Sequence, residues 1–199
     1  MNPMAAWSVG KYAKRSATIH LNSDAEAQIT KIAEGAVTAC DAGRTGITLE
    51  HALTQAAVGF FRAFEILGNK KYLEAGLTCA DRILKEQLAR GHWAYGNKGN
   101  DMMRIQDGFV TRPFWIMLYA HKLSGEKKYF ESAKRAADIL LSAQSEAGGW
   151  PDQWLFPGGS TPSSGVRNGS ISFNDGATNA SFQIMIMMYH LTKDNKYVS

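Results

Sequence analysis

Apolar residues recur three or four positions apart along most of the chain, which is the spacing of helices that bury one face. The pattern predicts six helices, over 24–40, 49–67, 70–88, 111–125, 127–143 and 177–191. Glycines follow several of these segments, as is usual where helices end. A strand-like run occurs only at 170–173 and is too short to build a sheet. The sequence therefore predicts an all-α fold.

The predicted helices contain an internal repeat. The run Leu-Gly-Asn-Lys-Lys-Tyr-Leu at 67–73 returns as Ser-Gly-Glu-Lys-Lys-Tyr-Phe at 124–130, and more loosely at 193–198. Tyr72 and Tyr129 are 57 residues apart, and Tyr197 follows 68 residues later. A period of this length is typical of stacked helical hairpins. We expect three helical hairpins arranged as an α/α toroid, with the more apolar helices inside.

The third copy of the repeat starts close to the last residue of the sequence. An outer helix should begin at about Lys196, and the sequence ends at Ser199. We therefore expect an irregular segment over 1–23 and a toroid domain over 24–199 that is incomplete at its C-terminus. The alternative is a whole domain with a short disordered tail.

Composition and charge narrow the class of protein. Apolar residues make up 45% of the chain and charged residues 20%, which fits a globular protein with a core. The net charge of +4 is too small to indicate nucleic-acid binding, and the longest apolar run is far short of the ~20 residues of a membrane helix. The two cysteines exclude a disulfide scaffold and a cysteine zinc site. We expect no nucleic-acid or membrane partner and a monomeric protein.

Three acidic residues share one position in the repeat. Glu50, Asp107 and Asp175 each lie 22 residues before a repeat tyrosine, at the entry to a predicted inner helix. In a toroid these entries face the same mouth. Acids also cap helices and interact favourably with helix N-termini, which explains the pattern without a ligand. The other interpretation is a site for a hard cation such as calcium, which prefers oxygen ligands.

Other catalytic signatures are missing from the sequence. The five histidines show no metal-ligand spacing, and there is no nucleophile elbow, dinucleotide fingerprint or P-loop. Trp93, Trp150 and Trp154 fall at predicted helix ends or in loops. Such tryptophans can be flat platforms for sugars or plugs of the barrel end, and the sequence favours neither.

The sequence contains Gly-Gly-Trp-Pro-Asp-Gln-Trp at 148–154, Ser-Phe-Asn-Asp-Gly-Ala at 172–177 and, earlier, the acidic run Arg-Ile-Gln-Asp at 104–107. These motifs resemble those of polysaccharide lyase family 10, the all-helical pectate lyases. The resemblance covers about 48–199. It implies a secreted or periplasmic, calcium-dependent lyase that cleaves polygalacturonate, an anionic polysaccharide, by β-elimination. The N-terminus has no apolar signal segment, so a signal is expected to be removed or to lie outside this sequence.

The resemblance also implies roles for individual residues. Asp107 and Asp175 correspond to the calcium ligands, and Trp150, Asn174 and Arg112 are candidate substrate contacts. The family's base is an arginine in the next repeat, so we expect it beyond Ser199 and expect this chain alone to be a poor catalyst. The family usually has Asn or Asp after each aspartate, whereas this chain has Gly108 and Gly176.

Two other functions remain open at this stage. A helical-toroid glycoside hydrolase needs two carboxylates across a sugar bond, and Asp107 and Asp175 can supply them. A non-catalytic glycan-binding helical repeat needs neither metal nor base. A terpene-cyclase repeat would need an acid-rich cluster such as Asp-x-Asp-Asp, which the sequence lacks.

Overall fold

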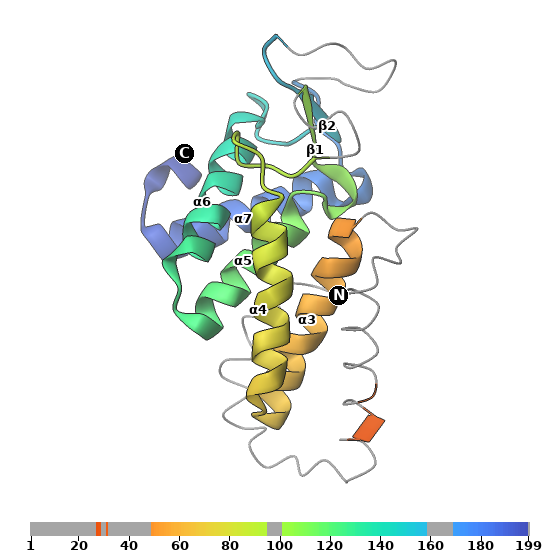
Figure 1. Cartoon of the computed structure of the whole chain (residues 1–199). Helices are drawn as coiled ribbons and strands as arrows, with labels where there is room; N and C mark the ends of the chain where they lie inside the picture. The colour runs from red at the N-terminus through yellow and green to blue at the C-terminus, as the bar shows by residue number, and fades with distance from the viewer. Residues whose placement is uncertain (1–26, 29–30, 32–48, 95–100, 159–168, 199) are drawn as a thin grey trace. The chain divides into compact units, whose positions relative to one another are not determined.

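A computed structural model describes residues 27–28, 31, 49–94, 101–158 and 169–198 (Figure 1). The irregular segment predicted over 1–23 and nearly all of the helix predicted over 24–40 lie outside these residues. The chain divides into two compact units. Unit 1 is Met1–Ile83 with Lys122–Gly125, and unit 2 is Leu84–His121 with Glu126–Ser199.

The described residues are mainly helical, which confirms the all-α prediction. The helices are α3 (Leu49–Leu67), α4 (Lys70–Lys85), α5 (Thr111–Ser124), α6 (Lys127–Ser142) and α7 (Ala177–Thr192). Strands β1 (Met102–Arg104) and β2 (Gln153–Leu155) form a small antiparallel pair in which Met103 is opposite Trp154. Short 3-10 turns are η2 (Gln106–Gly108), η3 (Asn174–Gly176) and η4 (Asn195–Tyr197). The toroid stays a prediction.

The core of unit 1 forms where α3 and α4 pack closely. Phe61 of α3 is fully buried, and a Cβ atom added to Gly76 of α4 would lie 2.5 Å from its ring. Glycine at this position therefore allows close approach of the ring to the α4 backbone. Cys79 is buried on α4, as expected for a small apolar side chain, whereas Cys40 lies outside the described residues.

In unit 2, helix α5 is buried almost all round. Every residue from 113 to 120 is buried, which agrees with its uniformly apolar sequence. Helix α6 buries one face, on which Tyr129, Ala133 and Leu140 are fully covered. Helix α7 packs against α6 and buries Ile184, Met185 and Met188. Among the described residues, no helix is both long and apolar enough to span a membrane.

The sequence repeat is present as a structural repeat. The three repeat tyrosines, Tyr72, Tyr129 and Tyr197, are all buried. In each case the preceding lysine places its Nζ over the tyrosine ring, at 5.0, 4.7 and 4.8 Å from the centroid. Each copy therefore combines a buried tyrosine with a cation–π contact from its neighbour.

The turns that follow α4 and α6 also match, at an offset of 57 residues. After α4, the side-chain amide of Gln87 donates to the Gly91 carbonyl at 2.8 Å. After α6, Gln144 donates to the Gly148 carbonyl at 3.0 Å. Three main-chain bonds recur at equivalent positions, and Gly91 and Gly148 both have a positive φ. A left-handed glycine and a glutamine side chain thus form the same turn after both helices.

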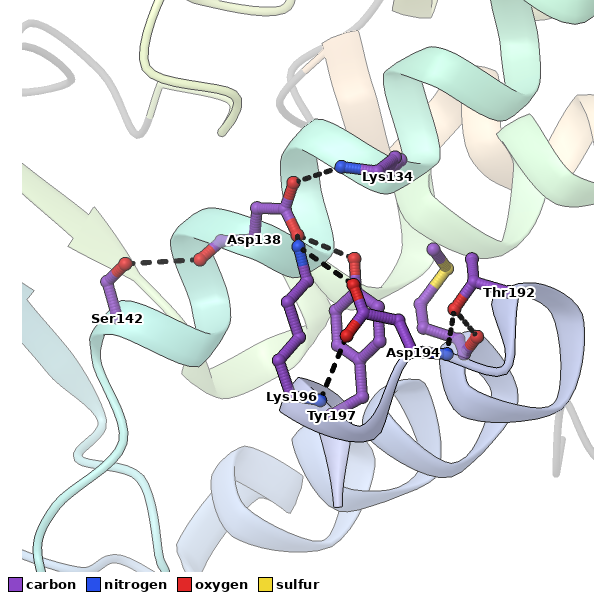
Figure 2. A network of polar contacts seen from close by, with 8 residues as sticks. Lys134, Asp138, Ser142, Thr192, Asp194, Lys196 and Tyr197 are labelled. Atoms are coloured by element: carbon purple, nitrogen blue, oxygen red, sulfur yellow. Dashed lines mark hydrogen bonds and ion pairs between the residues drawn. The ribbon is translucent and has the colours of Figure 1, made fainter. Parts of the chain in front are cut away.

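Turn η4 is fixed to α6 by a polar network centred on Asp138 (Figure 2). Tyr197 Oη donates to Asp138 Oδ1 at 2.5 Å, and Lys196 Nζ lies 2.9 Å from the same oxygen. Lys134 Nζ lies 2.7 Å from Asp138 Oδ2. Burial raises the pKa of the Asp138 carboxyl, but the three donors outweigh burial and hold the pKa below its ordinary value of 3.8.

We predict that Asp138 gives the fold a pH-dependent stability. A carboxyl whose pKa is lower in the folded than in the unfolded state stabilises the fold above the unfolded pKa, and this contribution disappears as the pH falls through the folded pKa. Asp138→Asn should therefore lower the free energy of unfolding by about 1 kcal/mol near neutral pH, because the carboxylate is 35% exposed and partly screened.

Urea unfolding of both proteins at neutral pH and at several values below 3.8 measures this effect. The difference between the wild type and Asp138→Asn should shrink on acidification. Glu131→Gln on the exposed side of α6 is the matched control and should change stability little at any pH. A difference that grows as the pH falls would contradict the prediction.

Candidate functional site

Two aspartates lie in unusual turns that precede helices of unit 2. Asp107 in η2 has φ 57° and Asp175 in η3 has φ 47°, both in the left-handed region. Aspartate is among the few non-glycine residues that adopt this conformation readily. The two turns contact each other, and α7 contacts both of them. The structure therefore brings together two of the three acids that share the repeat offset.

The glycines after these aspartates are also left-handed. Gly108 has φ 82° and Gly176 has φ 77°. The family residues expected there, Asn or Asp, are the next most tolerant of this conformation after glycine. A Cβ on Gly108 would lie 2.7 Å from Arg112 Nε, whereas a Cβ on Gly176 would meet nothing within 4 Å. A side chain would thus displace Arg112 at the first glycine but enter open space at the second.

Asp107 is held by two neighbours on its own segment. Arg104 Nη2 lies 2.5 Å from Asp107 Oδ2, and the Gln106 amide donates to the same oxygen at 3.3 Å. The Arg104 side chain is 16% exposed and Asp107 38% exposed. The Arg104 guanidinium also lies over the Phe109 ring, 4.9 Å from its centroid. Arg104 lies three residues before Asp107 in the acidic motif at 104–107, which is the only signal in the sequence that points to it.

Asp175 is more open and has a neutral partner. The Asn174 side-chain amide donates to Asp175 Oδ2 at 2.6 Å, and both residues are exposed. The Asn174 backbone N–H donates to Ser172 Oγ at 3.2 Å. Asn174 is therefore placed at the surface beside the acid, in a position that a substrate can reach.

Trp150, a candidate substrate contact and one of the three tryptophans considered as platforms or plugs, is buried. Its side chain is 1% exposed, and its indole Nε1–H donates to the Leu140 carbonyl at 2.7 Å. A buried indole presents no face on which a sugar ring can stack. Trp93 is buried in the same way, and Trp154 is partly exposed. In this structure Trp150 is a core residue rather than a platform.

The main chain of Trp150 instead positions the Asp175 turn. Its N–H donates to Thr178 Oγ1 at 3.0 Å, and that hydroxyl donates to the Trp150 carbonyl at 3.1 Å. The same carbonyl accepts the Ser172 N–H at 2.8 Å. These bonds join the Gly-Gly-Trp segment to both sides of the turn that carries Asp175.

The same segment also positions the Asp107 turn. The Asp152 carbonyl accepts the N–H groups of Ile105 and Gln106 at 2.8 and 3.1 Å. Arg104 pairs with Gln153 where β1 meets β2. Residues 150–153 thus hold both acidic turns through backbone hydrogen bonds, which gives a physical reason for the two sequence motifs to occur together.

The acidic site contains few ionisable groups. Within the described ranges, no group of three or more His, Cys, Asp or Glu side chains is placed to hold a metal ion. Glu50, the third acid of the repeat offset, is the second residue of α3 in unit 1, and its side chain lies outside the described residues. Arg112 is partly buried, with its side chain against Gly108. The site therefore comprises two carboxylates, the side-chain amides of Gln106 and Asn174, and two guanidinium groups.

Comparison with known proteins identifies the family. No curated protein sequence matches the chain. Residues 96–197, just over half of the chain, match the pectic acid lyase family. The matched range contains both acidic turns and the Gly-Gly-Trp segment that holds them. The family implies a lyase that acts on a pectin-type polysaccharide. The chain belongs to the pectic acid lyase family.

Proposed function

We propose that the chain is a calcium-dependent pectate lyase of polysaccharide lyase family 10 that cleaves polygalacturonate by β-elimination. In that reaction a base removes the proton on C5 of a uronate, a double bond forms between C4 and C5, and the C4 oxygen leaves. The observation that supports this most is the pair of left-handed aspartate turns, both held by residues 150–153. That pair lies within the range matched by the family.

Asp107 and Asp175 are the proposed calcium ligands. Their carboxylates lie on contacting turns, with the amide of Asn174 adjacent, and oxygen donors of this kind suit calcium. Two carboxylates supply at most about four of the six to eight oxygens that calcium takes, so water and substrate oxygens complete the set. A bound calcium ion would neutralise the uronate carboxylate and make the C5 proton more acidic.

Arg112 and Asn174 are the proposed substrate contacts. Arg112 lies against Gly108 in the Asp107 turn, where a guanidinium can pair with a uronate carboxylate. Asn174 lies at the surface beside Asp175, where its amide can bond a sugar hydroxyl. The base is assigned to none of the described residues. Polygalacturonate is a large polymer that an enzyme meets outside the cytoplasm, so we also propose that the protein is a secreted or periplasmic monomer.

The test is to incubate the protein with polygalacturonate and calcium and to follow the ultraviolet absorbance of the unsaturated product. We expect slow but calcium-dependent product formation that stops when a chelator is added. The assay needs a high protein concentration, because no described residue is assigned as the base and product formation is therefore expected to be slow. New reducing ends without the absorbance would indicate a hydrolase. Polymer binding without either product would indicate a glycan-binding domain.

A further inference from the structure

Arg104 is set into the structure as a fixed partner of Asp107. It lies on β1, whose pairing with β2 fixes the backbone, and its guanidinium packs over Phe109. Its Nη2 atom is 2.5 Å from Asp107 Oδ2, a charge-assisted contact. Only 16% of the side chain is exposed, so the guanidinium is held at the carboxylate rather than sampling solvent.

The two acidic turns differ in the charge of the group that is bonded to the aspartate. Asp175 accepts a hydrogen bond from the neutral amide of Asn174, whereas Asp107 is paired with a full positive charge. A positive group bonded to a carboxylate opposes the approach of a second cation to that carboxylate. The turns share backbone conformation and a following glycine, and they differ in the charge of the partner as well as in exposure.

We propose that Arg104 is an internal competitor for the cation site, which occupies the Asp107 carboxylate until a divalent cation displaces it. This inference rests on the proposed function, because it concerns the same cation. The displaced guanidinium remains on β1 beside the turn, where its charge is available to an anionic polymer. Arg104 is in this sense a positioning residue that lowers cation affinity and couples cation binding to binding of the polyanion.

The test is calorimetric titration of the full chain with calcium chloride. Arg104→Gln removes the charge and should bind calcium about three- to tenfold more tightly than the wild type. Arg104→Met, which keeps an apolar stem over Phe109, should behave in the same way and guards against loss of folding in the first variant. Arg104→Lys keeps the charge and should bind calcium nearly as the wild type does. Circular dichroism confirms that each variant is folded.

Two further variants make the result specific. Arg112→Gln removes a guanidinium for which the structure gives no ion pair with Asp107, and should change calcium affinity less than Arg104→Gln. Asp107→Asn in the Arg104→Gln background should abolish the gain. With calcium saturating, trigalacturonate should bind about threefold more weakly to Arg104→Gln than to the wild type.

The outcomes separate this inference from the proposed function. Calcium binding that is unchanged or weaker in both neutral variants of Arg104 would overturn the inference and leave the calcium site standing. Unchanged trigalacturonate affinity would overturn the coupling to the polyanion. An absence of calcium binding to the wild type and to both neutral variants would overturn the inference together with the calcium dependence on which it rests.

Discussion

Alanine in place of Trp150 should lower the free energy of unfolding by about 3–5 kcal/mol. The indole is 1% exposed, so its removal leaves a large cavity inside unit 2. The change also deprives the Leu140 carbonyl of its indole donor. Because backbone groups of Trp150 hold the Asp175 turn, local collapse around the cavity should loosen that turn as well. Urea unfolding of the two proteins measures the effect.

Trp150→Phe is the control for this experiment. Phenylalanine keeps much of the volume but cannot donate to the Leu140 carbonyl, so it should cost about 1–2 kcal/mol. A platform role would give a different pattern. Alanine would then leave the unfolding transition in place and weaken only the binding of oligogalacturonates. Near-wild-type stability of Trp150→Ala would thus contradict the burial of the indole.

Asparagine in place of both Asp107 and Asp175 should abolish calcium binding and reduce lyase activity by at least about a hundredfold. Asparagine is chosen because it tolerates the left-handed conformation of both turns, so the backbone should be retained. The substitution removes both proposed negatively charged ligands, and a neutral amide pair holds calcium much less well. Calcium calorimetry and the absorbance of the unsaturated product measure the two effects separately.

A charge-matched control is available in the same unit. Glu131→Gln with Glu146→Gln also removes two negative charges, and both side chains are exposed. This double variant should bind calcium and form product as the wild type does. Calcium affinity that is unchanged in the Asp107→Asn, Asp175→Asn protein would show that the ion binds elsewhere. An equal loss in the control would show a non-specific effect of net charge.

The helices could be predicted because local signals define them. Helix α4 has an apolar face and follows the left-handed Gly68, and α6 has the same pattern after Gly125. The predicted C-terminal end was three residues too far along the chain for α4 and one residue too far for α6, because Leu88 is partly buried and Ala143 is buried in the turns that follow. The first predicted helix falls almost wholly outside the described residues, and the predicted irregular segment does so entirely.

The site was only partly predictable. The repeat offset selected Glu50, Asp107 and Asp175 because position in a repeat determines position in space, and the contact between the turns of the two aspartates agrees with that expectation. For Trp150 the sequence left a sugar platform and a plug open, because its burial depends on packing between segments that are distant in sequence. The left-handed conformation of both aspartates and the ion pair of Arg104 likewise depend on tertiary structure.

The duplicated turn after α4 and α6 has a consequence for how this sequence can diverge. Three of its repeated hydrogen bonds join main-chain groups, and the fourth comes from Gln87 or Gln144. The side chains at 88–90 and 145–147 take no part in these four bonds, and they already differ at every position between the two copies. Substitutions can therefore remove the sequence similarity between the two copies, while one glutamine and one glycine in each copy are enough to keep the same backbone turn.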